Sequence, residues 1–307
     1  MLSTTQVAAL QTTQLSGLTT TSVGSLASTQ LNAISTTNLP GITTTQFVAL
    51  STTQVGALST TLVRSLSTTY VANLTSTQVG ALSSTQLVTL SATQIQGLDT
   101  TDLAALSTTQ ITTLTTTQIA ALNSTQFGAI ETTDLAVLTT AQFRVINTTQ
   151  IAGLTSTQVG VLSTTQVAGL TTTQVRAIET TDLAAMSSTQ IGALGTTQVA
   201  ALSTTQVAAL ETTDVAILNS TQLNALNATL VGNITTTQLA VVSTTQIGAL
   251  GTTQIRGLNT TQIAALSSTQ VGALNSTQLV SLTTTQIAGI DTTDLAALST
   301  TQITTLT

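Results

Sequence analysis

The sequence repeats every eight residues, without insertion or deletion, from Ser3 to Leu306, which gives 38 octads. With positions numbered 1 to 8 from Ser3, position 5 is Val, Ile, Leu or Phe, and position 8 is Leu, Ile, Met or Val. Position 3 is Thr except at Ala141, and position 4 is usually Gln. A short, strict period is typical of a solenoid, in which each repeat packs only against its neighbours. We predict one continuous repeat solenoid over residues 1–307, with 38 octads over 3–306 and no separate domains.

Position 1 marks the start of a helix in each octad. It is Ser, Thr, Asn, Asp or Gly in most octads, and these residues are the preferred helix N-caps. Gln or Asp usually follows three residues later, which completes a capping box, and the aliphatic residues at positions 8 and 5 form a hydrophobic staple around it. We predict an all-α fold, with one very short capped helix over positions 2 to 7 of every octad. Because isolated short helices are unstable, they must pack closely, and the small residues at positions 6 and 7 allow this.

A β-solenoid is the alternative fold. Thr, Val and Ile favour strands, and regular rows of Thr suit stacked rungs. However, positions 5 and 8 are spaced alternately by three and five residues, whereas a strand with one buried face needs a spacing of two. The preference for N-cap residues at position 1 also has no role in a strand, so the pattern favours the α-solenoid.

The charged residues follow a longer period of two octads. The ten acidic residues form five pairs at positions 1 and 4, namely Asp99 and Asp102, Glu131 and Asp134, Glu179 and Asp182, Glu211 and Asp214, and Asp291 and Asp294. The four basic residues, all at position 6, are Arg64, Arg144, Arg176 and Arg256. Acidic pairs fall only in odd octads and Arg only in even ones. We predict two octads per 16-residue coil, with an acidic stripe and an Arg stripe on opposite sides, although sequence duplication alone would give the same parity.

The composition excludes several classes of function. Only 5% of the residues are charged and the net charge is −6, with no His and no Cys. Nucleic-acid binding needs clustered basic residues, so we expect no nucleic-acid partner. The N-terminus has neither the basic nor the apolar region of a signal peptide, and the apolar runs are too short to insert into a membrane.

The residue types also argue against catalysis. Ser and Thr are abundant, but the chain has no His, Cys or Lys to activate a nucleophile. We therefore predict that the chain is not an enzyme and has no catalytic or cofactor-binding residues. Carboxylates are ligands for hard cations, but acids at positions 1 and 4 also suit the free amides and the dipole of a helix N-terminus. Capping is the preferred interpretation, with no metal site and no cofactor.

The unit Leu202 to Ala209, with the sequence Leu-Ser-Thr-Thr-Gln-Val-Ala-Ala, resembles octapeptide arrays in very large bacterial secreted or surface proteins, often of adhesin type. This resemblance implies an extracellular or cell-surface location and assigns no functional residue. The stretch Leu170 to Val175 also resembles the opening of TAL-effector repeats, which begin a helix in that way. The DNA-reading loop of that family is missing here, so DNA binding does not carry over.

The chain begins in register and stops at Thr307, the first residue of a further octad, without polar caps. Solenoids normally need such caps, and uncapped ends that stack on other copies build a filament. We therefore expect a structural protein that builds an extracellular filament or surface layer, with other copies of itself as the partner. The alternatives are a passive stalk in a giant bacterial adhesin, and a binding surface for ice or glycan formed by the Thr rows.

Overall fold

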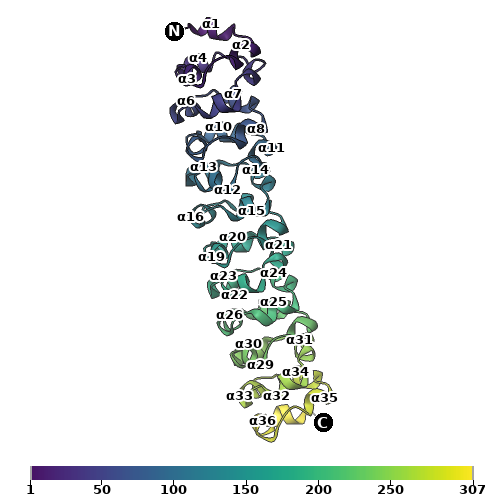
Figure 1. Ribbon diagram of the computed structural model, residues 1–307. Coiled ribbons are helices and arrows are strands. Elements are labelled where there is room, and N and C mark those ends of the chain that lie inside the picture. Colours follow the sequence, from purple (N-terminus) through teal and green to yellow (C-terminus); the bar gives the residue numbers. More distant parts are fainter. Residues whose placement is uncertain (1, 306–307) are drawn as a thin grey trace. The chain divides into compact units, whose positions relative to one another are not determined.

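The computed structural model describes residues 2–305; Met1, Leu306 and Thr307 lie outside the described part. The chain divides into two compact units, Met1–Leu154 and Thr155–Thr307, and each is described by itself. Every described octad forms one short helix, and within each unit these helices stack in successive coils (Figure 1). The predicted α-solenoid is therefore confirmed, and the β-solenoid is wrong, since residues 2–305 contain no strand.

The α-helices have four to six residues and begin at position 2. The first unit contains α1 Thr4–Ala8, α2 Thr12–Ser16, α3 Thr20–Gly24, α4 Ser28–Leu31, the 3₁₀ helix η1 Leu39–Gly41, α5 Thr44–Val48, α6 Thr52–Gly56, α7 Thr60–Ser65, α8 Thr68–Ala72, α9 Ser76–Gly80, α10 Ser84–Thr89, α11 Ala92–Ile95, α12 Thr100–Ala104, α13 Thr108–Thr113, α14 Thr116–Ala121, α15 Ser124–Gly128, α16 Thr132–Leu135, α17 Thr140–Arg144 and α18 Thr148–Ala152. The second unit contains α19 Ser156–Gly160, α20 Thr164–Gly169, α21 Thr172–Ala177, α22 Thr180–Ala184, α23 Ser188–Gly192, α24 Thr196–Ala201, α25 Thr204–Ala209, α26 Thr212–Ile217, α27 Ser220–Ala225, α28 Ala228–Val231, α29 Thr236–Ala240, α30 Thr244–Ala249, α31 Thr252–Gly257, α32 Thr260–Ala264, α33 Ser268–Gly272, α34 Ser276–Ser281, α35 Thr284–Ile287, α36 Thr292–Ala297 and α37 Thr300–Thr304.

The capping box predicted at positions 1 and 4 starts most of these helices. In α10, the backbone N–H of Gln86 donates to Ser83 Oγ at 3.2 Å, and Gln86 Oε1 accepts from the backbone N–H of Ser83 at 2.7 Å. Ser83 itself is extended, with φ −70° and ψ 157°. Leu90, at position 8 of the same octad, is also extended, so two consecutive non-helical residues separate this helix from the next.

One octad departs from this pattern because it contains the only proline of the chain. Pro40 occupies position 6, where its missing N–H and its ring are incompatible with the α-helical hydrogen bond to position 2. The octad forms η1 instead, and its N-cap residue Asn38 is helical rather than extended.

Each coil contains three octads, so the prediction of two octads per coil is wrong. Throughout both units, a helix packs against the helix three octads later, as in the pairs α1 with α4, α12 with α15 and α24 with α27. The coil therefore repeats every third octad. The two-octad parity of the charged residues must then come from the sequence itself, for which duplication of a two-octad unit is sufficient.

The predicted charge stripes are also wrong. Within the second unit, the acidic pairs that begin at Glu179, Glu211 and Asp291 are separated by four octads and then by ten. Each separation exceeds a whole number of coils by one octad, so successive pairs lie on successive sides of the coil. Arg176 and Arg256, also ten octads apart, likewise lie on different sides. The acids and the arginines are thus distributed around each unit rather than collected on one face.

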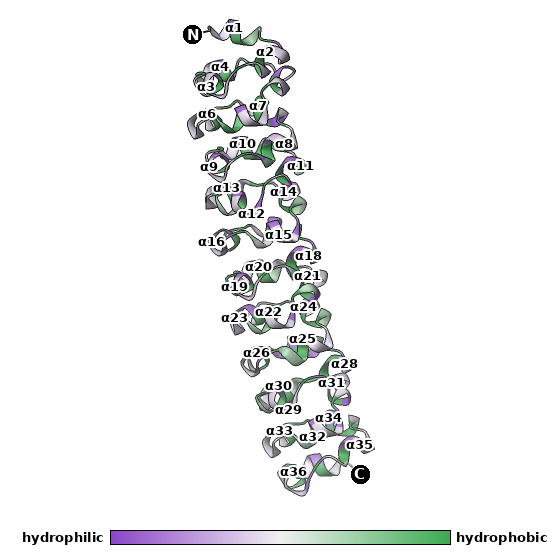
Figure 2. Ribbon diagram, in the orientation of Figure 1, coloured by the Kyte–Doolittle hydropathy of each residue, from purple (hydrophilic) through white to green (hydrophobic). Residues whose placement is uncertain are grey.

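The core consists of the side chains at positions 5 and 8, as predicted. In octads with coils on both sides these residues are buried, as Leu87, Leu90 and Ile111 are. Figure 2 shows hydrophobic and hydrophilic residues mixed in the coils of both units. This is the thin core expected from a repeat with two aliphatic residues in every octad.

Small residues allow neighbouring coils to come close, as predicted for positions 6 and 7. A Cβ atom at Gly257, the last residue of α31, would lie 2.7 Å from the Cα of Ala228 and 2.8 Å from its carbonyl oxygen. At Gly160, the last residue of α19, the nearest atom to an added Cβ would be the Ala185 carbonyl oxygen at 3.7 Å, an ordinary contact.

We predict that Gly257→Ala destabilises the coils formed by α28 and α31 by about 1–3 kcal/mol, because the added methyl group overpacks the junction. Gly160→Ala is the matched control and should be neutral or stabilising by up to about 1 kcal/mol. Native-state hydrogen exchange of the two helices measures both effects. Equal effects of the two substitutions would show that close backbone approach does not limit residue size at Gly257.

Candidate functional site

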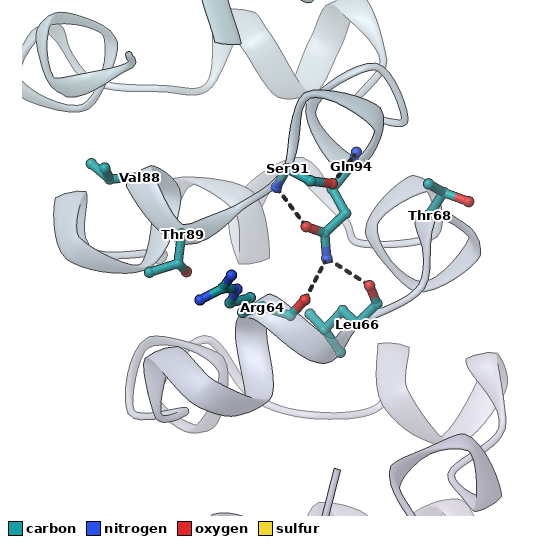
Figure 3. Close-up of a pocket in the computed structure, with 7 residues that line it drawn as sticks. All are labelled: Arg64, Leu66, Thr68, Val88, Thr89, Ser91 and Gln94. Atoms are coloured by element: carbon teal, nitrogen blue, oxygen red, sulfur yellow. Dashed lines mark hydrogen bonds between the residues drawn. The ribbon is translucent and has the colours of Figure 1, made fainter. Parts of the chain in front are cut away.

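The side chain at position 4 connects each coil to the preceding one. In α11, Gln94 Nε2 donates to the carbonyl oxygens of Leu66 at 2.6 Å and Arg64 at 3.4 Å, both in α7 or just after it. The same side chain accepts through Oε1 from the backbone N–H of Ser91 at 2.7 Å. Figure 3 shows this amide between the N-cap of its own helix and the C-terminal carbonyls of the helix below it. One side chain therefore satisfies backbone groups at two helix ends.

The same connection recurs at fixed sequence separations along both units. The amide donates to the position 8 carbonyl 28 residues earlier and to the carbonyl of position 5 or 6 in the same earlier octad. These glutamines are buried; Gln150, for example, is 0% exposed. Glutamine is rarely buried without hydrogen-bond partners, and in residues 2–305 every buried side-chain N or O atom has one. The sequence predicted the capping half of this role but not the contact between coils.

At two octads where position 4 is not Gln, other groups take over some of its contacts. Tyr70 donates its hydroxyl to the carbonyl oxygens of Ile42 and Leu39, which lie in the irregular octad of η1. Where Leu62 replaces Gln, the N–H of the N-cap residue Ser59 donates instead to Asn32 Oδ1, 2.6 Å away in the preceding coil. A hydrogen bond between coils is therefore present at both of these octads although position 4 is not Gln.

We predict that Gln150→Met opens the junction between α14 and α18. Gln150 Nε2 donates to Ile119 O at 3.0 Å and to Leu122 O at 2.7 Å. Methionine removes both bonds, and because Ile119 O still accepts from Leu122 N, we expect a cost of about 1–3 kcal/mol, mainly from Leu122 O. The control is Gln14→Met, because Gln14 is exposed and bonds only to Gln11 N. Loss of hydrogen-exchange protection in α18 measures the effect, and equal protection in both variants would contradict it.

A groove of about 630 Å³ lies beside this connection in the first unit (Figure 3). Its lining residues are Arg64, Leu66, Thr68, Val88, Thr89, Ser91 and Gln94. Arg64 is the charged side chain among them, and the amide of Gln94 is already occupied by the contacts above. The groove offers a cation and hydroxyl groups, but its lining contains no general base that could activate a nucleophile.

The acidic pairs cap helices, although only the aspartates at position 1 do so with their side chains. Asp99 Oδ1 accepts from the backbone N–H of Asp102 at 2.8 Å, and Asp102 Oδ2 accepts from the N–H of Asp99 at 3.0 Å. By contrast, Glu131, Glu179 and Glu211 make no side-chain cap hydrogen bond. The prediction of carboxylate capping is therefore correct for aspartate and wrong for glutamate, which is one methylene longer.

Two aspartates at position 4, Asp134 and Asp182, bond to a hydroxyl group in the preceding coil. Thr108 Oγ1 donates to Asp134 Oδ1 at 2.6 Å, and Ser156 Oγ donates to Asp182 Oδ1 at 2.7 Å, each across 26 residues. The other three aspartates at position 4 all have Ser at this separation, although Ser occupies position 2 in only nine octads. Aspartate and a hydroxyl at this fixed separation thus form a pair, a signal in the sequence that the repeat pattern alone does not reveal.

Burial raises the pKa of two of the aspartates, Asp102 and Asp214, whereas hydrogen bonding lowers the pKa of Asp99. Burial, followed by the neighbouring charge of Asp99, raises the pKa of Asp102 above its ordinary value. Burial also raises the pKa of Asp214. The exposed Asp99 differs, because the hydrogen bond from the Thr101 hydroxyl, at 2.7 Å, lowers its pKa. The protonated form is therefore more favoured at Asp102 and Asp214, and the ionised form more favoured at Asp99, than in an ordinary aspartate.

We predict that Thr108→Ala weakens the packing of α16 on α13 by about 1.5–3 kcal/mol, the range for a hydrogen bond to a charged group. Thr108 is exposed, so its only large loss is the bond to Asp134. Thr108→Ser should keep that bond. A second control is Thr116→Ala, because the residue at the same separation from Thr116 is Gln142. Hydrogen exchange in α16 and α17 measures the difference, and an equal loss in Thr116→Ala would refute the pairing.

The two faces of a coil differ, and the end coils reveal this. In the first coil, Gln6 and Gln14 at position 4 are exposed, whereas Val7 and Leu15 at position 5 are buried. Position 4 therefore faces the preceding coil and position 5 faces the following one. The last coil agrees, since its position 5 residues are exposed by 36–41%; they are Ile287, Leu295 and Ile303.

The chain matches the sequence model of the ALTTAQ repeat over residues 23–60, 95–129, 127–164, 175–212 and 243–276, together more than half of its length. The chain belongs to the ALTTAQ repeat family. The six letters of the name correspond to positions 7, 8 and 1 to 4, as in Val137 to Gln142, where Val takes the place of the first Ala. These six letters thus cover the turn between two octads and the N-cap and position 4 amide of the second one. No curated protein matches the chain.

The described residues of this ALTTAQ repeat array place no group of three or more His, Cys, Asp or Glu side chains where they could hold a metal ion. Among the helices of residues 2–305, none has the length and apolar character needed to cross a membrane. That the chain is not an enzyme, and that it binds no cofactor and no nucleic acid, stay predictions.

Proposed function

We propose that this ALTTAQ repeat array is a structural protein whose copies stack end to end into an extracellular filament or surface layer. The observation that carries the proposal is the complementarity of the two faces of a coil. One face presents amide donors at position 4, and the other presents carbonyl acceptors and aliphatic side chains. Faces that fit each other in this way build open filaments, because head-to-tail contacts do not close.

The two end coils present the same complementary faces that meet at the internal junctions, and this complementarity supports association with another copy. Gln6 and Gln14 on the first coil are exposed amides that face away from the next coil. On the last coil, a following coil would place its amides at the position 8 carbonyls of Leu282, Ile290 and Leu298, by the separation that the internal junctions use. The same contact would cover the exposed aliphatic residues at position 5. A second copy offers both groups in the spacing of those internal junctions.

The extracellular or cell-surface location rests on the resemblance to octapeptide arrays of large bacterial surface proteins. The low charge of the chain and its regular hydroxyl rows are consistent with a passive structural role. Recovery of the chain from the surface or the medium of its own cells would test the location separately from the assembly.

We predict that the purified chain forms filaments whose length grows with concentration in electron micrographs. Leu295→Asp should abolish them, because the substitution places a charge in an otherwise apolar contact. The control is Val280→Asp, since Val280 is 63% exposed at position 6 and lies outside the face that a following coil would cover. A monodisperse monomer at every concentration would reject self-assembly and favour a passive stalk. Filaments that survive Leu295→Asp would show that copies associate through another surface.

A further inference from the structure

The junctions at Asp102 and Asp214 contain fewer hydrogen-bond donors than the junctions formed by Gln. At Gln86, Nε2 donates to Val55 O and Leu58 O, while Oε1 accepts from Ser83 N. An ionised carboxylate at this position is acceptor-only. Replacing Gln by Asp therefore removes two donors and adds a negative charge between the coils.

The same sequence separations place the carbonyl oxygens of Val71 and Leu74 opposite Asp102, and those of Leu183 and Met186 opposite Asp214. In the described chain, no side-chain donor reaches Leu74 O or Met186 O. Asp102 is 2% exposed and Asp214 is 1% exposed, so both carboxylates are shielded from water. Ser76 Oγ bonds to Thr101 Oγ1 at 3.3 Å, and the effect of Ser76 on Asp102 and of Ser188 on Asp214, which lowers each pKa, is smaller than the effect of burial. The carbonyl oxygens of Val71 and Leu183 each accept a backbone N–H, so the acceptors left without a side-chain donor are Leu74 O and Met186 O.

No positive charge compensates either buried carboxylate. Asp102 is faced by Asp99 at the start of its own helix, and the helices packed against it, α9 and α15, contain no ionisable residue. Asp214 is faced by Glu211 at the start of its own helix, and the packed helices α23 and α29 likewise contain none. The helices that supply the opposite carbonyls, α8 and α22, contain Tyr70 and Asp182 but no basic residue. Each buried carboxylate therefore has a like charge three positions away in the sequence and no basic residue in these helices.

We propose that Asp102 and Asp214 make their junctions protonation-dependent, so that neighbouring coils hold together more tightly in acid than at neutral pH. Protonation removes the buried charge and adds one O–H donor to a junction with too few donors. The raised pKa of both carboxyls agrees with this assignment. The proposal concerns junctions inside one chain and does not depend on filament formation.

The direction of the pH dependence follows from linkage. A carboxyl with a raised pKa in the folded state binds more protons when folded, so it stabilises the junction fully below the unfolded pKa of about 3.9. That stabilisation is lost as the pH rises through the folded pKa. Asp99 has the opposite dependence, because its lowered pKa contributes stability above the unfolded pKa. An acid-stabilised signal at these two junctions is therefore expected from Asp102 and Asp214 and not from Asp99.

Carboxyl ¹³C NMR of the full chain tests the proposal directly. We expect Asp102 and Asp214 to titrate at higher pH than Asp99. We also expect exchange protection in α9, α12, α23 and α26, corrected for intrinsic rates, to rise between about pH 7 and about pH 4, by roughly tenfold for each unit of raised pKa. Asp102→Asn and Asp214→Asn should each remove the rise at its own junction.

Introducing the Asp102 arrangement at a Gln junction tests whether that arrangement is sufficient for the pH dependence. Gln150 has Asn147 at its N-cap, and Ser124 stands at the separation from Gln150 that Ser76 has from Asp102. Asn147→Asp combined with Gln150→Asp should therefore reproduce the Asp102 arrangement, with lower protection in α18 at neutral pH and recovery in acid. Titration of Asp102 and Asp214 at or below the ordinary aspartate range would overturn the proposal. So would an acid-induced rise in protection that persists in Asp102→Asn and Asp214→Asn.

Discussion

The amide at position 4 is the interaction on which the rest of the structure depends. A helix of four to six residues cannot form alone, because nucleation costs more than so few hydrogen bonds return, and its end groups outnumber its internal bonds. In α10, Gln86 caps the start of its own helix and supplies donors to the carbonyls at the end of α6 and just after it. Local helix formation and stacking of coils are therefore one event, since neither set of backbone groups is satisfied without the other.

This interaction also gives the array its direction. The amide reaches only toward the preceding coil, and the aliphatic residue at position 5 packs only toward the following one. The face of a coil that meets the following coil is therefore chemically different from the face that meets the preceding coil. Where the repeat sequence changes, a neighbouring coil can supply another hydrogen bond. Tyr70 donates to a carbonyl in the octad of Pro40, and Asn32 accepts from the N-cap N–H of the octad in which Leu62 replaces Gln. Such local replacement is expected in a solenoid, because the stability of each repeat depends on its contacts with neighbouring repeats.

The sequence predicted what depends on neighbouring residues and missed what depends on residues a coil away. Ser83 and Gln86 define a helix start within half an octad, and the aliphatic positions define the core, so both predictions were correct. The number of octads per coil depends on contacts between octads three or four apart. The parity of the acidic pairs indicated the wrong period, because duplication of a two-octad unit is sufficient to produce it. Burial of Gln86 was missed for a related reason, because a capping-box glutamine is equally well satisfied at a surface. Only its second set of bonds, to carbonyls 28 and 31 residues earlier, requires burial.

The buried aspartates make sense in the same terms. In a linear array, an opening starts at the junction with the least favourable interface, because each repeat contacts only its neighbours. Gln junctions are nearly alike, so an array built only from them has no preferred point of opening. The junctions at Asp102 and Asp214 differ from the Gln junctions by one charge and two donors, and their carboxylates accept the backbone N–H groups of Asp99 and Glu211. The shortage of donors makes such a junction responsive to a proton, because protonation of the carboxylate removes the buried charge and adds an O–H donor.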